Sequence, residues 1–112
     1  MLIDNHDFAI DVTAADKAVI SGVLRLPSPA AYEERFKPIR EALTKADDPY
    51  TIDISAVQFL NSSGITGLSR LVLLARTQKT PLVLIGSTRT SWQAKTLKPI
   101  ARLYDKVDVQ LL

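Results

Sequence analysis

The pattern of hydrophobic and polar positions changes period several times along the chain, and each change predicts a new element. Short alternating or continuous apolar runs are typical of strands, whereas apolar residues spaced by three and four indicate helices. We predict strands at 8–12, 17–24, 50–54, 81–86 and 107–111, and helices at 30–46, 65–78 and 91–97. Strands that alternate with helices imply an α/β fold, here in the order β-β-α-β-α-β-α-β. The sheet should be mostly parallel, with an antiparallel strand at its start.

The first predicted helix has a clear start and an internal proline. Ser28 is a typical N-cap residue, and Pro29 suits the first helical position. Pro38 lies inside the helix, where it removes a backbone hydrogen bond, so we expect a kink or a split there. The apolar face of this helix consists of Tyr32, Phe36, Ile39 and Leu43.

The turn between the strand at 50–54 and the helix at 65–78 contains three good helix-capping residues, Asn61, Ser62 and Ser63. The first turn of a helix has unpaired N–H groups and a partial positive charge. An anion, or a phosphate added to a hydroxyl at this point, is therefore favoured. The same residues also fit an ordinary helix cap, and local sequence alone favours that interpretation, because caps of this kind are common.

One side of the helix at 65–78 is apolar and the other is mostly polar. The apolar side is expected to face the sheet and consists of Ile65, Leu68, Leu71, Val72 and Ala75. Leu73 falls among the polar residues Thr66, Ser69, Arg70, Arg76 and Thr77. It is either an isolated exposed leucine, which is common, or an apolar contact for a docking partner on the side that extends back toward Ser62.

The C-terminal third of the chain is expected to complete the sheet. The continuous apolar run at 81–86 predicts an inner strand covered on both faces, and the alternation at 107–111 predicts an edge strand. Lys98-Pro99 should interrupt the helix at 91–97, with one further turn at 100–104. Trp92 is expected to be a partly buried anchor. The basic residues Arg89, Lys95, Lys98 and Arg102 form either a solvated face or an attraction for an acidic partner.

Composition limits the class of protein. A chain of 112 residues fits one domain, and its 46% hydrophobic and 23% charged residues are typical of a globular protein. The formal net charge of +2, from interspersed basic and acidic residues, is too small to favour nucleic acid. The absence of cysteine excludes disulfides. The first residues do not resemble a signal peptide, and no apolar run is long enough for membrane insertion.

The residues that usually carry catalysis are sparse. His6 is the only histidine, which argues against a Ser-His-Asp triad or a histidine metal site, and we expect it to be solvated. The aspartates are scattered, and no glycine-rich phosphate loop of the Walker type occurs. We expect no catalytic residue, no metal and no cofactor. A small hydrolase built on Ser62 would lack a visible general base.

The segment 53–68, Asp-Ile-Ser-Ala-Val-Gln-Phe-Leu-Asn-Ser-Ser-Gly-Ile-Thr-Gly-Leu, resembles the signature of STAS domains, the anti-sigma factor antagonist family. That signature runs roughly Asp-Leu-Ser, four or five residues, then Asp-Ser-Ser-Gly-Leu-Gly. The order of elements agrees over nearly the whole chain. The resemblance implies one STAS-like domain over 1–112, with four or five strands and helices mainly on one face. In the family, the residue at the position of Ser62 is phosphorylated; Asn61 stands where Asp is usual.

The resemblance also implies a function. The chain would be a cytoplasmic, bacterial, non-enzymatic switch that binds an anti-sigma factor or a related serine kinase when unphosphorylated. Phosphorylation at Ser62 would release the partner, and a serine phosphatase of the PP2C type would reverse it. The alternative is a STAS binding module of a lipid-trafficking ABC-type transport complex, without phosphorylation. The residues expected to form the partner-binding surface are Asn61, Ser62, Ser63, Gly64, Thr66, Ser69 and Leu73.

Overall fold

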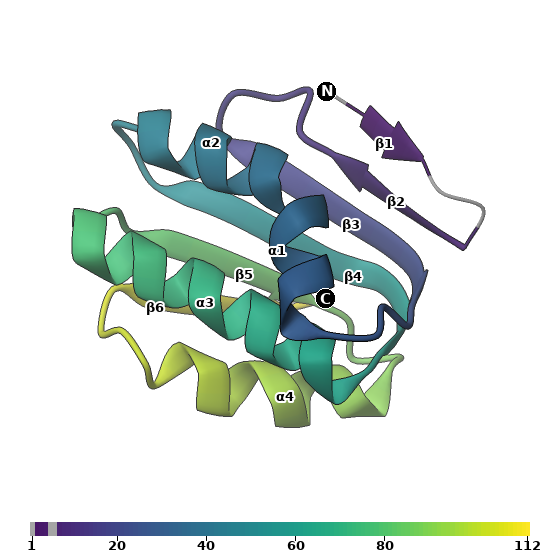
Figure 1. Cartoon of the computed structure of the whole chain (residues 1–112). Coiled ribbons are helices and arrows are strands. Elements are labelled where there is room, and N and C mark those ends of the chain that lie inside the picture. Colours follow the sequence, from purple (N-terminus) through teal and green to yellow (C-terminus); the bar gives the residue numbers. More distant parts are fainter. Residues whose placement is uncertain (1, 5–6) are drawn as a thin grey trace.

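In the part of the chain that the structure describes, a six-stranded sheet forms one layer and four helices form the other (Figure 1). The computed structural model describes residues 2–4 and 7–112. The strands lie side by side in the order in which they occur along the chain. They are β1 (Leu2–Asp4), β2 (Phe8–Asp11), β3 (Lys17–Leu24), β4 (Tyr50–Leu60), β5 (Leu82–Gly86) and β6 (Val107–Leu111).

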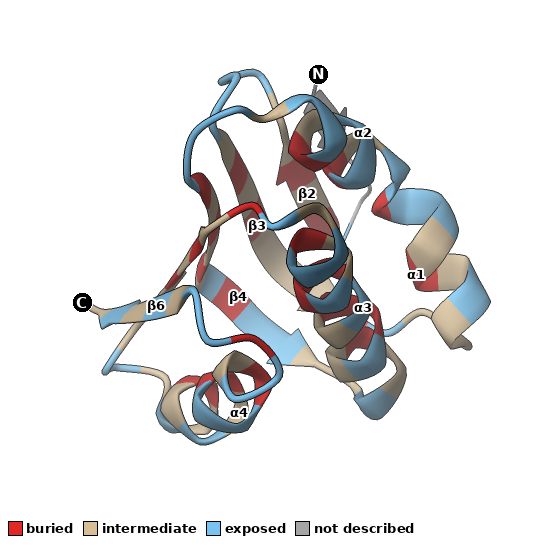
Figure 2. Cartoon of the chain, turned by 90° about the vertical axis from the view of Figure 1, so that its left-hand side faces the viewer, coloured by how far each residue is buried: buried red, intermediate tan, exposed pale blue. Residues whose placement is uncertain are grey.

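The direction of the strands explains why the helices share one face. β1, β2 and β3 are antiparallel neighbours, whereas β3, β4, β5 and β6 run parallel. Parallel neighbours need crossover connections, which are almost always right-handed. Because every crossover steps in the same direction, all the helices cover the same face (Figures 1 and 2). They are α1 (Pro29–Arg35), α2 (Lys37–Lys45), α3 (Ser62–Gln78) and α4 (Ser91–Ala101). The predicted fold class is confirmed.

The core lies between the sheet and the helices (Figure 2). Every second residue of the central strands points into it, as the pleat of a strand requires. In β5, Leu82 and Leu84 are buried, whereas Val83 and Ile85 are only half-buried. The prediction that this strand is covered on both faces is wrong, because no described helix lies on the second face.

The predicted break at Pro38 is confirmed, and it takes the form of a split. α1 begins after Ser28, whose side chain accepts a hydrogen bond from the Ala31 N–H at 3.2 Å. Phe36 separates α1 from α2, and Pro38 lies in the first turn of α2, where a missing N–H costs nothing. The predicted apolar face spans both helices: Tyr32, Phe36, Ile39 and Leu43 are all buried.

The main differences from the predictions are the ends of two elements and one additional strand. β4 continues to Leu60 instead of ending at residue 54, because it stays paired with β3 as far as Leu24↔Leu60. α4 continues through Pro99 to Ala101, since a proline in the last turn removes only one hydrogen bond. β1 had not been predicted, so the sheet has one strand more than expected. The expectation for His6 lies outside the described residues. β6 is an edge strand, as predicted.

Candidate functional site

The amide of Asn61 caps α3 and is held on three sides. Its Oδ1 accepts from the Gly64 N–H at 3.0 Å and from the Tyr32 hydroxyl at 2.7 Å. Its Nδ2 donates to the Leu26 carbonyl at 2.9 Å. Since a backbone N–H and a backbone carbonyl contact opposite atoms of the amide, its orientation is fixed. An aspartate here could not donate to Leu26, which explains why asparagine suits this corner.

The Tyr32 hydroxyl closes a small ring of hydrogen bonds around the same corner. It accepts from the Leu26 N–H at 3.2 Å and donates to Asn61. Burial raises the pKa of Tyr32 above its ordinary value, although the Leu26 hydrogen bond partly opposes the shift. The hydroxyl therefore remains a donor at neutral pH. Through this ring the chain leaving β3, helix α1 and the start of α3 hold one another in place.

The glycines of the motif allow α1 to approach α3 closely. A Cβ added at Gly64 would lie 2.3 Å from the Leu60 side chain and 2.9 Å from the Tyr32 ring. One added at Gly67 would lie 2.9 Å from the Tyr32 Cβ. Real Cβ atoms do not approach other atoms so closely. A larger residue at Gly67 would therefore push α1 away, and one at Gly64 would displace the Leu60 side chain and the Tyr32 ring. Gly64 is buried and belongs to this packing, so it offers no surface to a partner.

Ser62 is exposed at the first position of α3. Because Asn61 supplies the cap, the Ser62 hydroxyl is not needed to start the helix. No residue in the described part of the chain forms a hydrogen bond with this hydroxyl; only the backbone carbonyl of Ser62 accepts one, from Thr66. The first turn of a helix carries free N–H groups and a partial positive charge. An anion attached to Ser62 would therefore sit in a favourable field.

The other predicted surface residues follow Ser62 along the outer side of α3. Thr66 is exposed, Ser69 is half-exposed, and Leu73 is 40% exposed. Successive steps of three or four residues place them on one stripe. The hydroxyls of Thr66 and Ser69 donate to carbonyls of their own helix, which leaves mainly apolar atoms facing outward. Ser63 is half-exposed beside this stripe. The predicted inner side is confirmed, since Leu68, Leu71, Val72 and Ala75 are buried and Ile65 is half-buried.

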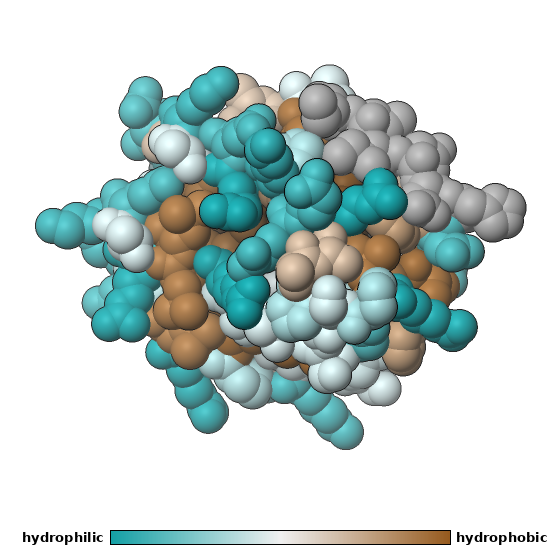
Figure 3. Space-filling model, in the orientation of Figure 1, coloured by the Kyte–Doolittle hydropathy of each residue, from teal (hydrophilic) through white to brown (hydrophobic). Residues whose placement is uncertain are grey.

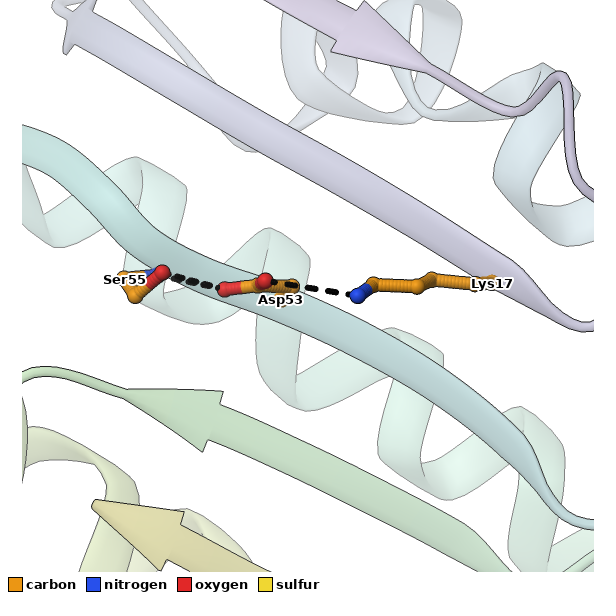
Figure 4. Close-up of polar contacts among 3 residues, drawn as sticks. All are labelled: Lys17, Asp53 and Ser55. Atoms are coloured by element: carbon orange, nitrogen blue, oxygen red, sulfur yellow. Dashed lines mark hydrogen bonds and ion pairs between the residues drawn. The ribbon is translucent and has the colours of Figure 1, made fainter. Parts of the chain in front are cut away.

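The first part of the motif, Asp53-Ile54-Ser55, lies away from Ser62. The Asp53 carboxylate accepts from the Ser55 N–H at 2.9 Å and from the Ser55 hydroxyl at 2.6 Å, and lies 3.7 Å from Lys17 Nζ (Figure 4). The pairing register of β3 and β4 shifts just after Asp53. The Asp53–Ser55 contacts stabilise this irregular strand, so their role is structural.

Gln93 supports the strand that leads to Ser62, and the sequence did not reveal this role. It is fully buried, and its Nε2 donates to the carbonyls of Ile54 and Val57 at 2.9 and 2.8 Å. Its Oε1 accepts from the Ser87 N–H. β5 pairs with β4 only as far as Asp53, so Gln93 satisfies carbonyls that would otherwise have no partner. No local signal marks this residue, because glutamine is usually exposed.

Trp92 is half-buried, as predicted, and it acts beside Gln93. Its Nε1 donates to the Gln58 carbonyl at 3.1 Å, so the start of α4 holds the extension of β4 that leads to Ser62. Phe59, at the end of this extension, is 42% exposed. The Arg25 guanidinium lies 5.1 Å from the centre of its ring. Phe59 belongs to the motif at 53–68, but its contact with Arg25 is not predicted from the sequence.

The described residues offer little for catalysis at this corner. No carboxylate or imidazole within residues 2–4 and 7–112 forms a hydrogen bond with Ser62. The same part of the chain has no group of three or more His, Cys, Asp or Glu side chains that could hold a metal ion. In the region that the structure describes, none of the helices is long and apolar enough to cross a membrane.

Comparison with known proteins supports the fold. No family model matches the chain, and no curated protein matches it. The fold is similar to that of SiaC in the crystal structure of the diguanylate cyclase SiaD with its activator SiaC from Pseudomonas aeruginosa. The likeness has a TM-score of 0.75, covers 100% of this chain and 99% of that one, and has 15% sequence identity. At this identity, the comparison shows a shared fold over the full length.

Proposed function

We propose that this chain is a regulatory protein that binds a protein partner and is controlled by reversible phosphorylation of Ser62. The observation that carries the proposal is the exposed Ser62 hydroxyl, which follows the cap at Asn61 and has no structural task in the described part of the chain. A group that takes part in no fold-stabilising contact can be modified while the fold survives. The resemblance of residues 53–68 to STAS domains supports the same position.

A phosphate on Ser62 should change the binding of a partner at the surface and leave the fold intact. It would add about −1.5 to −2 charges near neutral pH, and the N-terminus of α3 would offset part of them. A partner docked over Ser62 would have to desolvate or repel the new anion. Losing about 2.7 kcal/mol of binding free energy lowers affinity roughly a hundredfold. Phosphorylation would therefore end binding without unfolding the protein.

The nature of the partner is proposed from two likenesses. The STAS resemblance points to an anti-sigma factor or a related serine kinase, with a serine phosphatase of the PP2C type restoring the unmodified form in the bacterial cytoplasm. The structural neighbour SiaC is the activator of another protein, a diguanylate cyclase. Both likenesses favour a binding partner over a chemical substrate, so we propose that the chain has no enzymatic activity of its own.

Two baits test this function. Tagged Ser62→Ala and Ser62→Asp proteins are used to purify partners from the host, and each recovered protein is then titrated against both. We expect the alanine bait to retain a partner. The affinity of the aspartate bait for that partner should be lower by about tenfold or more. Ser63→Asp is the matched control, because it adds the same charge one position later, and it should bind the partner more tightly than Ser62→Asp does. Equal affinity of both Ser62 variants for every recovered partner would contradict the proposal.

A further inference from the structure

The basic and acidic residues are interspersed only outside residues 54–104. Between Asp53 and Asp105 the sequence contains no aspartate or glutamate, although basic and acidic residues alternate elsewhere. The same segment includes all of α3, β5 and α4. It carries seven basic residues, and all of them are exposed: Arg70, Arg76, Lys79, Arg89, Lys95, Lys98 and Arg102. The small net charge of the whole chain conceals this basic half.

Most of these cations have no carboxylate partner. Arg70 pairs with Glu33 of α1, so its charge is compensated. Within the described residues, no salt bridge involves Arg76, Lys95, Lys98 or Arg102. A surface that gathers cations without anions attracts negatively charged partners and raises their association rate.

An apolar groove lies between α3 and α4 on this basic surface. It is lined by Ile65 and Ser69 from α3, by Thr96 and Pro99 from α4, and by Leu103 just after α4, with Lys95 at its rim. Leu103 is 36% exposed. Figure 3 shows apolar side chains gathered in a band on the left of the view, which crosses the C-terminal half of α3 and reaches toward the end of α4, with hydrophilic side chains around it.

The groove begins one helical turn from Ser62. Ile65 is three residues after Ser62, and Ser69 continues the same side of α3. A segment lying in the groove would therefore pass beside Ser62. Because the groove adjoins Ser62, the inference about what binds in it rests on the proposed function.

We infer that the groove between α3 and α4 receives an amphipathic helix of a protein partner, with apolar residues facing the groove and Asp or Glu residues facing the surrounding cations. Helix-in-groove binding needs an apolar floor and complementary charge, and both are present here. A phosphate on Ser62 would repel the same acidic helix. The groove has no aromatic lining residue, which single-stranded nucleic acid would use for stacking.

The probes are two synthetic amphipathic helical peptides with the same apolar face and with either Glu or Lys on the polar face. Binding is followed by fluorescence anisotropy, and the site is mapped by amide chemical shifts. We expect the Glu peptide alone to bind, to shift the signals of Ile65, Ser69 and Thr96, and to weaken as salt is raised. Lys95→Glu should weaken it about tenfold or more, whereas Lys37→Glu, the same exposed charge change on α2, should change it by less than about twofold.

Other outcomes would overturn the inference. These are an absence of binding, equal binding of both peptides, shifts that map elsewhere, or tighter binding of an oligonucleotide or anionic vesicles to the same face. Ser62→Asp separates this inference from the proposed function. If the Glu peptide binds in the groove but Ser62→Asp leaves its affinity unchanged, the groove is a binding site but charge at Ser62 does not control it. The inference is then supported and the proposed switch is contradicted. If the Ser62 baits behave as proposed while the Glu peptide does not bind, the inference about the groove is contradicted and the proposed control by Ser62 is supported.

Discussion

At the scale of single residues, Asn61 and Ser62 divide between them the two tasks of the corner. Asn61 uses all sides of its amide to hold α3, α1 and the chain after β3. Ser62 is left exposed and without a fold-stabilising side-chain contact in the described chain. Substitutions at these two adjacent residues should therefore have very different effects on the stability of the fold. Comparing them tests whether the two residues have separate roles.

We predict that Asn61→Asp lowers the free energy of unfolding by about 1–3 kcal/mol, because the Leu26 carbonyl loses its donor and faces a carboxylate. Ser62→Ala should change it by less than about 0.5 kcal/mol, since an exposed side chain without a partner is removed. Urea denaturation measures both. An aspartate variant as stable as the parent would mean that the amide hydrogen bond contributes little.

The sequence identified Ser62 as a candidate but could describe Asn61 only as a cap without charge. Its reason for being an amide depends on Leu26 and Tyr32, which are distant in sequence and meet it only in the fold. The contact between Arg25 and Phe59 was missed for the same reason. Their contact depends on the pairing of β3 with the extension of β4. Phe59 lies inside the motif at 53–68, but Arg25 belongs to no recognisable local motif.

At the scale of elements, α3 separates a buried face from a docking stripe. Replacing Leu68 with Ala should destabilise the protein by about 2–5 kcal/mol, because a fully buried side chain leaves a cavity. Leu73→Asp should change stability by less than about 0.5 kcal/mol, since Leu73 is 40% exposed. Thermal melts of both variants measure the difference. A reversed order would place Leu73 in the core and remove it from any partner surface.

Gln93 lies in α4, and its side chain forms hydrogen bonds that hold the last part of β4 in place. We predict that Gln93→Leu lowers stability by roughly 2–4 kcal/mol, because the carbonyls of Ile54 and Val57 and the Ser87 N–H lose their partner inside the protein. Gln110→Leu on the exposed edge strand is the control and should have a small effect. Unfolding and the fluorescence of Trp92 report the global and local changes. Equal stability of the two variants would contradict this role.

The elements themselves were largely predictable, since amphipathic spacing located each helix and alternation located most strands. The extension of β4 was not, because the residues after Ile54 do not alternate regularly: the ladder with β3 shifts register twice. α4 was predicted too short, because Pro99 was treated as a helix end although only one hydrogen bond is lost there.

At the scale of the whole molecule, the helices cover one face of the sheet and form the core with it. A tyrosine in this core makes the stability of the protein depend on pH in the alkaline range. Tyr50 is buried, and its hydroxyl has no hydrogen-bond partner within the described residues. Burial, with a smaller effect of the Asp16 charge, raises the pKa of Tyr50 to about 12. The unfolded chain would lose this proton near pH 10. Stability is therefore fully present below about pH 10 and falls as pH rises toward 12.

We predict a loss of roughly 2–3 kcal/mol from Tyr50 over this range, which Tyr50→Phe should not show. At neutral pH the phenylalanine variant should be about as stable as the parent or more so, because it removes a buried hydroxyl without a partner. Denaturant unfolding at several alkaline pH values measures the difference. Parallel curves for the two proteins would show that Tyr50 does not determine the alkaline limit.

The proposed function depends on phosphate at one hydroxyl, and mass spectrometry of the protein from its own host measures this directly. Cleavage after Lys45 and Arg70 gives a peptide, 46–70, that holds Ser55, Ser62, Ser63, Thr66 and Ser69 together, so fragmentation must assign the position. We predict a phosphorylated fraction with phosphate on Ser62, lost in Ser62→Ala and kept in Ser63→Ala. A peptide that is never phosphorylated across growth conditions, or that carries its phosphate on another residue, would contradict the account.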